Sequence, residues 1–217
     1  AGKLGEEEFL KGSRPWPRYV TDYRPMVEFA KAKGWPVIAG NVPRRWASLV
    51  GRKGLVGLDS LGPTERAQAA VSFNCPRDKY YERFKTTMGD MSGHGQKITP
   101  QEAAAMVDRF YEAQCVKDET MGEAIANARA KWPDAVIVHV NGSFHSDFGQ
   151  GTAERAKNRL PGARSAGRSE PRRGCDCHKH TTRPSRSRAA CAAGDRRRRP
   201  ALDRRPQPSP REPSHDL

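Results

Sequence analysis

Residues 134–151, with the sequence DAVIVHVNGSFHSDFGQG, decide the predicted fold of this chain. The β-branched run from Val136 to Val140 lies between an Asp-Ala and an Asn-Gly pair, which predicts a short strand that is buried on both faces. A turn of small residues follows the strand and carries His145. Ligands of open α/β sheets bind beyond the carboxyl ends of such strands, so Asn141, Ser143, His145 and Asp147 are candidate site residues.

The rest of the pattern predicts an α/β domain. A second short strand is predicted at residues 36–40, PVIAG. Amphipathic patterns predict helices at residues 6–11, 22–34, 43–54, 78–88, 99–131 and 152–160. This order favours a mostly parallel sheet that is flanked by helices. Two strands are too few for an ordinary sheet, so we expect an incomplete domain.

Composition divides the chain near residue 160. The net charge of the 217 residues is +14, and residues 161–217 carry 15 Lys and Arg against six Asp and Glu. These residues include no Ile, Val, Met or aromatic side chain, so they cannot bury enough apolar surface to fold. We therefore expect one domain over residues 1–160 and a disordered, Arg/Pro-rich basic tail over residues 161–217.

The basic tail has three interpretations. A polybasic segment can act as a nucleic-acid-binding module, and we expect such binding to lack specificity. A solvated tail without a role is the second interpretation. A shifted reading frame in a GC-rich gene, which would give the same mixture of residues, is the third.

The sequence also bears on processing and cross-links. No run of 18 apolar residues predicts a transmembrane helix. The chain begins AGKLGEEEF, without an initiator Met or a signal peptide, so we expect a processed form or a fragment. The five cysteines are odd in number and scattered, and they indicate no disulfide framework.

Several polar residues stand where apolar ones are expected. Arg44 and Arg45 open a helix, where the dipole disfavours cations; they either bind an anionic ligand group or face solvent. Gln114, Lys117 and Asp118 interrupt the apolar stripe of the helix at 99–131. Either the helix breaks there, or these side chains reach the site from the helix.

Four segments carry a family resemblance. They are SRPWPRYVTDYRPMVEFAKAKGWPVIAGNVPRRWASLVGRKG at 13–54, YYERF at 80–84, AQCVKDETMGEAIA at 113–126 and HVNGSFHSDFGQGTAERAKNRLPGA at 139–163. Together they resemble the ChaN-like haem-binding family of the Tiki/TraB superfamily. The resemblance implies an α/β domain linked to haem binding and iron uptake, in proteins that are often lipoproteins of the bacterial cell envelope.

The resemblance also implies a place for His145. The superfamily carries a pair of Gly-x-x-His motifs, and the stretch from Gly142 to His145 fits the second of them. The first motif belongs to an early strand and has no counterpart here. The chain therefore resembles the later part of the domain, without its amino-terminal strand.

Haem binding needs an axial ligand, an apolar slot and cations for the propionates. The candidate axial ligands are His145, His94, Tyr80, Tyr81 and Tyr111. Arg44 and Arg45 are the candidate propionate partners, and Asn141 lies beside the site. His94 lies in a glycine-rich loop, which either donates a ligand or has no such role. His139, within the predicted strand, is expected to be a core residue.

The rival function is a metal-dependent hydrolase, with His145 and Asp147 as ligands of a divalent metal. Without the first motif the ligand count is short, so we rank binding ahead of catalysis. Ser143 and His145 are too close along the chain to indicate a nucleophilic triad. A homodimer is a further expectation.

Overall fold

A computed structural model describes residues 4–13, 15–89, 99–164 and 166–167. The chain divides into two units, Ala1–Glu170 and Pro171–Leu217, and the described residues all belong to the first. The candidate ligand His94 lies outside the described residues. So does most of the basic tail, and the expectations about its disorder, its reading frame and its nucleic-acid binding lie outside them as well.

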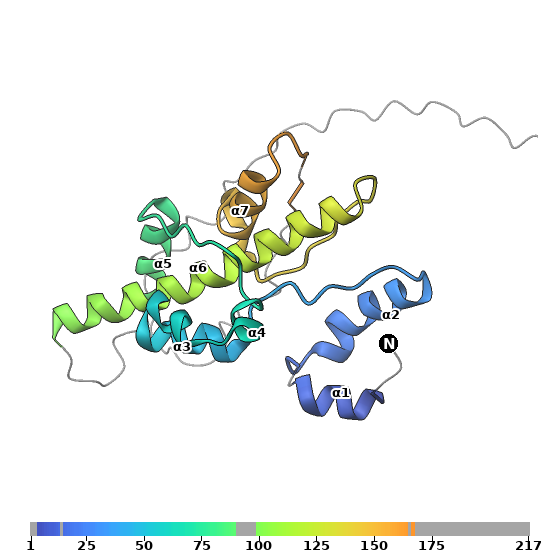
Figure 1. Cartoon of the computed structure of the whole chain (residues 1–217), viewed down its shortest axis with the longest axis horizontal. Helices are drawn as coiled ribbons and strands as arrows, with labels where there is room; N and C mark the ends of the chain where they lie inside the picture. Colours follow the sequence, from blue (N-terminus) through green and yellow to red (C-terminus); the bar gives the residue numbers. More distant parts are fainter. Residues whose placement is uncertain (1–3, 14, 90–98, 165, 168–217) are drawn as a thin grey trace, which may run out of the picture. The chain divides into compact units, whose positions relative to one another are not determined.

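The described residues form helices joined by turns and extended segments (Figure 1). The α-helices are α1 (Glu6–Ser13), α2 (Arg24–Ala32), α3 (Arg44–Lys53), α4 (Pro63–Arg66), α5 (Lys79–Gly89), α6 (Pro100–Lys131) and α7 (Thr152–Arg159). A π-helical turn, η1, covers Tyr19–Tyr23, and 3-10 turns cover η2 (Leu55–Ser60), η3 (Ser143–His145) and η4 (Asp147–Gly149). The six predicted helices are therefore confirmed, with small shifts at their ends.

The predicted α/β fold is wrong, because the described residues contain no strand and no sheet. Residues 36–40 and 136–141 are extended, but within the described ranges their backbones form no hydrogen bonds with a neighbouring strand. Val136 and Val138 are 89% and 81% exposed, whereas Ile137 and His139 between them are half-buried. β-branched residues favour an extended backbone, yet a sheet also needs partner strands, and none lies beside these segments.

Helix α6 is the central element of this unit. Its first turn is closed by the predicted capping box: the Glu102 amide donates to Thr99 Oγ1 (3.2 Å), and the Thr99 amide donates to Glu102 Oε2 (2.8 Å). The helix then runs for 32 residues without interruption. The alternative that it breaks near Lys117 is therefore wrong.

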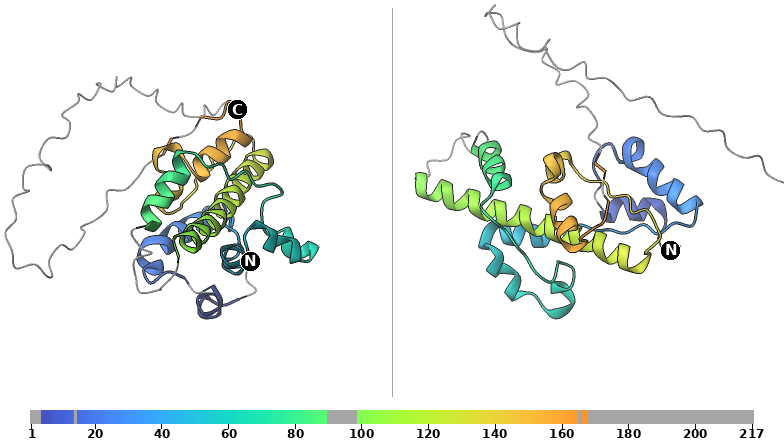
Figure 2. Two further views of the ribbon diagram at one scale, coloured as in Figure 1. Left: turned by 90° about the vertical axis from the view of Figure 1, so that its left-hand side faces the viewer. Right: turned by 90° about the horizontal axis from the view of Figure 1, so that it is seen from above.

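Other helices pack on two sides of α6. The two views in Figure 2 agree with Figure 1 that α3 lies on one side, and α5 and α7 lie on the other. The first side buries a cluster around Val50, Leu58 and Val116, and the second buries the rings of Tyr80 and Tyr111. Polar residues that lie between α5, α6 and α7 are thus enclosed by helices.

Helix α7 approaches α6 closely at Gly122. A Cβ atom at this position would lie 2.7 Å from Arg155 Cβ and 3.0 Å from the Ala156 amide, so a larger residue would push the helices apart. The buried Glu119 carboxylate adds an ion pair to Arg159, with 2.6 Å between Oε2 and Nη2. These contacts fix the position of α7 on α6.

Cys75 and Cys115 form a disulfide, contrary to the expectation that the cysteines indicate no cross-link. Their Cα atoms are 5.7 Å apart, although 40 positions separate them in the sequence. The bond ties the segment before α5 to the middle of α6. Spacing along the chain did not reveal it, because the pairing depends on how the two segments meet in the folded unit.

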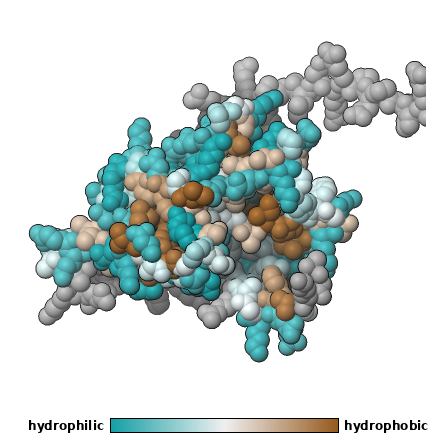
Figure 3. Space-filling model, in the orientation of Figure 1, coloured by the Kyte–Doolittle hydropathy of each residue, from teal (hydrophilic) through white to brown (hydrophobic). Residues whose placement is uncertain are grey.

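Large apolar side chains remain exposed. Figure 3 shows several apolar surfaces open on one face, and Val37, Ile38, Val136 and Val138 are each more than half exposed. Two of these residues belong to each of the segments that were predicted as strands. The outer sides of both segments are therefore apolar and uncovered.

Candidate functional site

The buried carboxylate of Asp118 is the centre of the candidate site. This side chain is 0% exposed, in the middle of α6. Tyr80 donates its hydroxyl to Oδ2 (2.7 Å), and Thr152 donates its hydroxyl to Oδ1 (2.8 Å). His145 Nδ1 lies 2.7 Å from Oδ1. A buried charge needs several partners to offset its desolvation, and these three side chains supply them.

Four elements bring these side chains together. Asp118 comes from α6, Tyr80 from α5, Thr152 from the first turn of α7 and His145 from the turn η3. Gln114 lies one turn before Asp118 on the same face of α6 and donates to the Tyr80 hydroxyl (3.0 Å). Two of the polar residues that interrupt the stripe of α6 therefore reach the site from the helix, as the second alternative predicted.

The imidazole of His145 is held by one nitrogen. Its short contact to the Asp118 carboxylate assigns the proton to Nδ1, because a carboxylate accepts and does not donate. Gln114 Nε2 lies 3.1 Å from the same nitrogen. No described residue forms a hydrogen bond with Nε2, and the side chain is 18% exposed. With the proton on Nδ1, Nε2 carries a lone pair. Because the side chain is partly exposed, Nε2 can bind a ligand or a metal.

Gly151 lets the chain pass close to His145. Its φ angle is +58°, in the left-handed region, and a Cβ atom there would collide with the His145 carbonyl. Phe148 has φ of +60° and is the only non-glycine residue in this region among the described residues. Strained residues of this kind often lie at functional sites.

Arg83 holds the same turn from α5. Its Nη2 donates to the Phe144 carbonyl (2.9 Å), and its guanidinium carbon lies 4.2 Å from the centre of the Phe144 ring. Asp147 Oδ2 lies 3.9 Å from Arg83 Nη1, so Asp147 faces this cation. These contacts fix the residue just before His145.

The segment before His145 carries two further polar side chains, His139 and Asn141. Burial lowers the pKa of His139, and the neighbouring His145 lowers it further. His139 Nε2 and Asn141 Nδ2 are buried without a hydrogen-bond partner in the structure. The other end of the Asn141 amide is engaged: its Oδ1 accepts a hydrogen bond from the Ser146 hydroxyl (3.2 Å).

Lys117 follows the site along α6. Burial lowers the pKa of this amine, the Asp118 charge opposes that effect, and Arg44 adds to it. No described residue forms an ion pair or a hydrogen bond with the Lys117 ammonium group. An anionic group of a ligand would therefore stabilise the charged form of Lys117, which partial burial disfavours.

The candidate tyrosines are engaged within the protein. The buried Tyr111 hydroxyl donates to the Pro76 carbonyl (2.6 Å), and burial raises its pKa to about 12. Tyr81 donates to Asp108 (2.7 Å), which raises its pKa. Burial and the nearby Asp118 raise the pKa of Tyr80 strongly. A tyrosine binds iron as its anion, and these environments all oppose that form.

The two candidate arginines have different surroundings. Arg45 lies with its guanidinium carbon 4.4 Å from the centre of the Trp46 ring, and it donates to Gln68 Oε1 (3.4 Å). Arg44 has no hydrogen-bond or ion-pair partner among the described residues. The structure therefore brings Gln114, Asp118 and Tyr80 to His145, and it places Tyr81, Tyr111 and Arg45 in contacts of their own.

Thr152 is the site residue that the sequence analysis missed. It is 1% exposed and stands at the start of α7, where a hydroxyl commonly serves the backbone as a helix cap. A Thr directly after a glycine turn gives no sign that its hydroxyl reaches another helix. Only the close packing of α7 on α6 shows its role.

Two findings within the described ranges bear on the predicted functions. No three His, Cys, Asp or Glu side chains there lie close enough to share a metal ion, so the hydrolase alternative, with His145 and Asp147, finds no metal site in them. No helix among the same residues is long and apolar enough to cross a membrane.

Fold and site together define a helical domain that holds one imidazole against a buried carboxylate. A family model described as haem-binding uptake, Tiki superfamily, ChaN, matches residues 1–156. The chain therefore belongs to the ChaN family of haem-binding uptake proteins. This finding confirms the resemblance drawn from the sequence. No curated protein and no solved structure matches the chain.

Proposed function

We propose that this chain binds haem and that His145 Nε2 would hold its iron. The observation that carries the proposal is the 2.7 Å contact between His145 Nδ1 and the buried Asp118, which leaves Nε2 without a partner among the described residues. Histidines that bind metals commonly donate their other nitrogen to a carboxylate, which fixes the tautomer and makes the ligand more basic. Membership of a haem-binding family supports haem as the bound group.

The surroundings of His145 fit an apolar macrocycle. Val136, Val138 and Val140 lie on the exposed side of the segment that leads to the site. Haem buries its ring against apolar side chains and supplies the iron that an imidazole binds. The chain's own residues then set the orientation of the ring nitrogen and keep its proton on Nδ1.

The propionates require cations. We assign this role to Lys117, because its amine lies close enough to Asp118 to interact with that charge, is partly buried and has no anionic partner among the described residues. Arg45 is the weaker candidate because Trp46 and Gln68 engage it. The role predicted for Arg44 stays a prediction, as do the cell envelope and a homodimer, whereas the family description supports a link to haem and iron uptake.

A haem titration of the full chain, followed by the Soret band, tests the proposal. His145→Gly should abolish the low-energy shift of the band, since the iron loses its imidazole. Added imidazole should restore the shift in His145→Gly, because the free ligand can enter the vacated space. Restoration would separate ligation from a purely structural role of His145.

Matched variants exclude the rival ligands. Tyr81→Phe and His94→Ala should keep the wild-type spectrum, and so should a chain in which all three tail histidines, His178, His180 and His215, are changed to Ala. An unchanged Soret band in His145→Gly, or its loss in His94→Ala alone, would contradict the proposal. A spectrum lost only in the tail variant would mean that haem binds adventitiously.

A further inference from the structure

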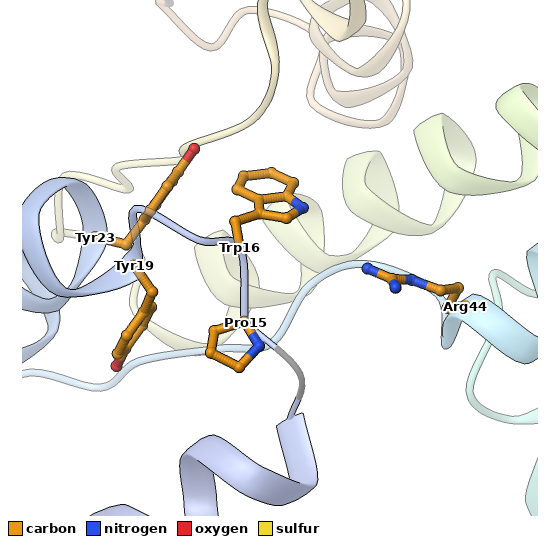
Figure 4. A pocket seen from close by; sticks show the side chains of 5 residues that line it. All are labelled: Pro15, Trp16, Tyr19, Tyr23 and Arg44. Atoms are coloured by element: carbon orange, nitrogen blue, oxygen red, sulfur yellow. The ribbon is translucent and has the colours of Figure 1, made fainter.

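An open surface pocket of about 320 Å³ contains no residue of the Asp118 site. We name it the Trp16 pocket. It is lined by Pro15, Trp16, Tyr19, Tyr23 and Arg44 (Figure 4). The pocket is therefore a separate candidate site, with aromatic walls and one cation.

The aromatic walls are arranged by η1. Tyr19 and Tyr23 stand four residues apart in this π-helical turn, and Figure 4 shows their side chains pointing apart, with Tyr23 on the side of Trp16. The Trp16 and Tyr23 rings meet edge to face, with 5.1 Å between their centres and 62° between their planes. Trp16 nevertheless stays 54% exposed. Rings held by each other yet open to solvent offer a preformed surface for a flat ligand.

Arg44 supplies the charge. Figure 4 shows its side chain reaching from α3 toward the aromatic group. It is exposed, it has no ion-pair partner among the described residues, and it stands at the first position of α3, where the helix dipole disfavours a cation. Arg44 also lies close enough to Lys117 to lower the pKa of that amine. An anion beside Arg44 would offset both unfavourable effects.

We propose that the Trp16 pocket binds a small flat aromatic ring system that bears a carboxylate. The rings would stack on Trp16 and meet Tyr23 edge to face, and the carboxylate would pair with the planar guanidinium of Arg44. The volume is at the low end of small-molecule sites, which run from about 300 to 1,000 Å³, and this favours a compact ligand over a peptide. Arg45 does not serve here, since its guanidinium lies on Trp46.

Isothermal titration of the full chain with 2-naphthoate tests this site. Trp16→Ala and Arg44→Gln should each weaken binding about tenfold or more, since one loses the stacking surface and the other a charged hydrogen bond. Two matched variants should bind as the wild type does. Trp35→Ala removes an equally exposed indole outside the pocket, and Arg45→Gln removes the neighbouring cation.

A neutral probe tests the charge without any substitution. Naphthalene-2-carboxamide has the same rings, and it should bind the wild-type chain about tenfold more weakly than naphthoate. His145→Gly should bind naphthoate unchanged, which separates this site from haem binding. Equal binding of the two probes, unchanged binding in Arg44→Gln, or equal losses in Trp16→Ala and Trp35→Ala would overturn the proposal.

Discussion

His145 Nδ1 and Asp118 Oδ1 lie 2.7 Å apart, although 27 positions separate the two residues in the sequence. One belongs to a 3-10 turn with an open side, and the other is fully buried in the middle of the longest helix. The contact therefore joins the interior of the helical unit to its surface. Changes deep in α6 are expected to reach a ligand of His145 through this pair.

Asp118→Asn should weaken haem binding. The amide does not carry the negative charge that fixes the His145 proton, and loss of such a partner typically costs tenfold to about a hundredfold in affinity for the bound metal. A haem titration measures the change. Asp108→Asn is the matched control, because Asp108 accepts from Tyr81 away from His145, and it should bind as the wild type does. Equal affinities for the wild type and Asp118→Asn would refute the role of Asp118.

Gly151→Ala should both destabilise the chain and weaken haem binding. The new methyl group would collide with the His145 carbonyl, and it would also hold a left-handed backbone at a cost of about 1–2 kcal/mol. Gly34→Ala is a matched control, since Gly34 has φ of +66° and no atom lies within 4 Å of the place that its new methyl group would take. Urea unfolding should show the larger loss for Gly151→Ala, and only that variant should lose affinity. Equal losses in the two variants would show that the contact with His145 does not matter.

Tyr111→Phe should lower stability without changing the haem spectrum. The substitution leaves the Pro76 carbonyl without its donor, which costs about 1–3 kcal/mol when the acceptor is buried. Chemical denaturation and a Soret spectrum of the same sample measure both quantities. A lost Soret band with unchanged stability would instead identify Tyr111 as the ligand.

The Cys75–Cys115 disulfide should contribute to stability. In the chain-entropy account, closing a loop of 40 residues stabilises the folded state by roughly 4 kcal/mol. Cys75→Ser should therefore melt at a lower temperature than the wild type under non-reducing conditions, and a reductant should remove the difference. Cys191→Ser, which leaves this bond intact, is the control. A melting temperature insensitive to Cys75→Ser would argue against the cross-link.

Stability should fall in mild acid because of His139. Burial holds the pKa of His139 below its ordinary value of 6.5, and the neighbouring imidazole of His145 lowers it further. The charge of Asp118 acts in the opposite direction. As the pH falls below that value, the unfolded chain binds the proton first. This contribution is therefore fully present above pH 6.5 and is lost as the pH falls through the folded-state pKa. His139→Gln should reduce the slope of unfolding free energy against pH, and an unchanged slope would contradict the assignment.

Local patterns predicted the helices well. The Thr99–Glu102 capping box and the long apolar stripe gave the start and extent of α6, because both depend on residues a few positions apart. Polar residues within that stripe pointed to Gln114 and Asp118 before any contact was known. A buried polar residue must have a partner, and this rule linked the helix to the site.

Contacts between distant segments could not be predicted in the same way. The valines at 136–140 favour an extended backbone, but a sheet also needs neighbouring strands, and the described residues contain none. No local pattern in the sequence reveals whether such neighbours exist. The bond between Cys75 and Cys115 and the hydroxyl of Thr152 on Asp118 likewise depend on packing. The local pattern and the family resemblance both indicated His145, and the structure shows that Asp118 is its partner.

The uncovered side of residues 136–140 has a consequence for the behaviour of the protein in solution. Val136, Val138 and Val140 alternate along a backbone whose amides and carbonyls have no strand beside them within the described ranges. An exposed apolar segment with unpaired backbone groups can pair with other molecules, so concentrated samples are expected to aggregate through it. This aggregation-prone segment ends just before His145. A ligand that covers it would therefore also reduce aggregation.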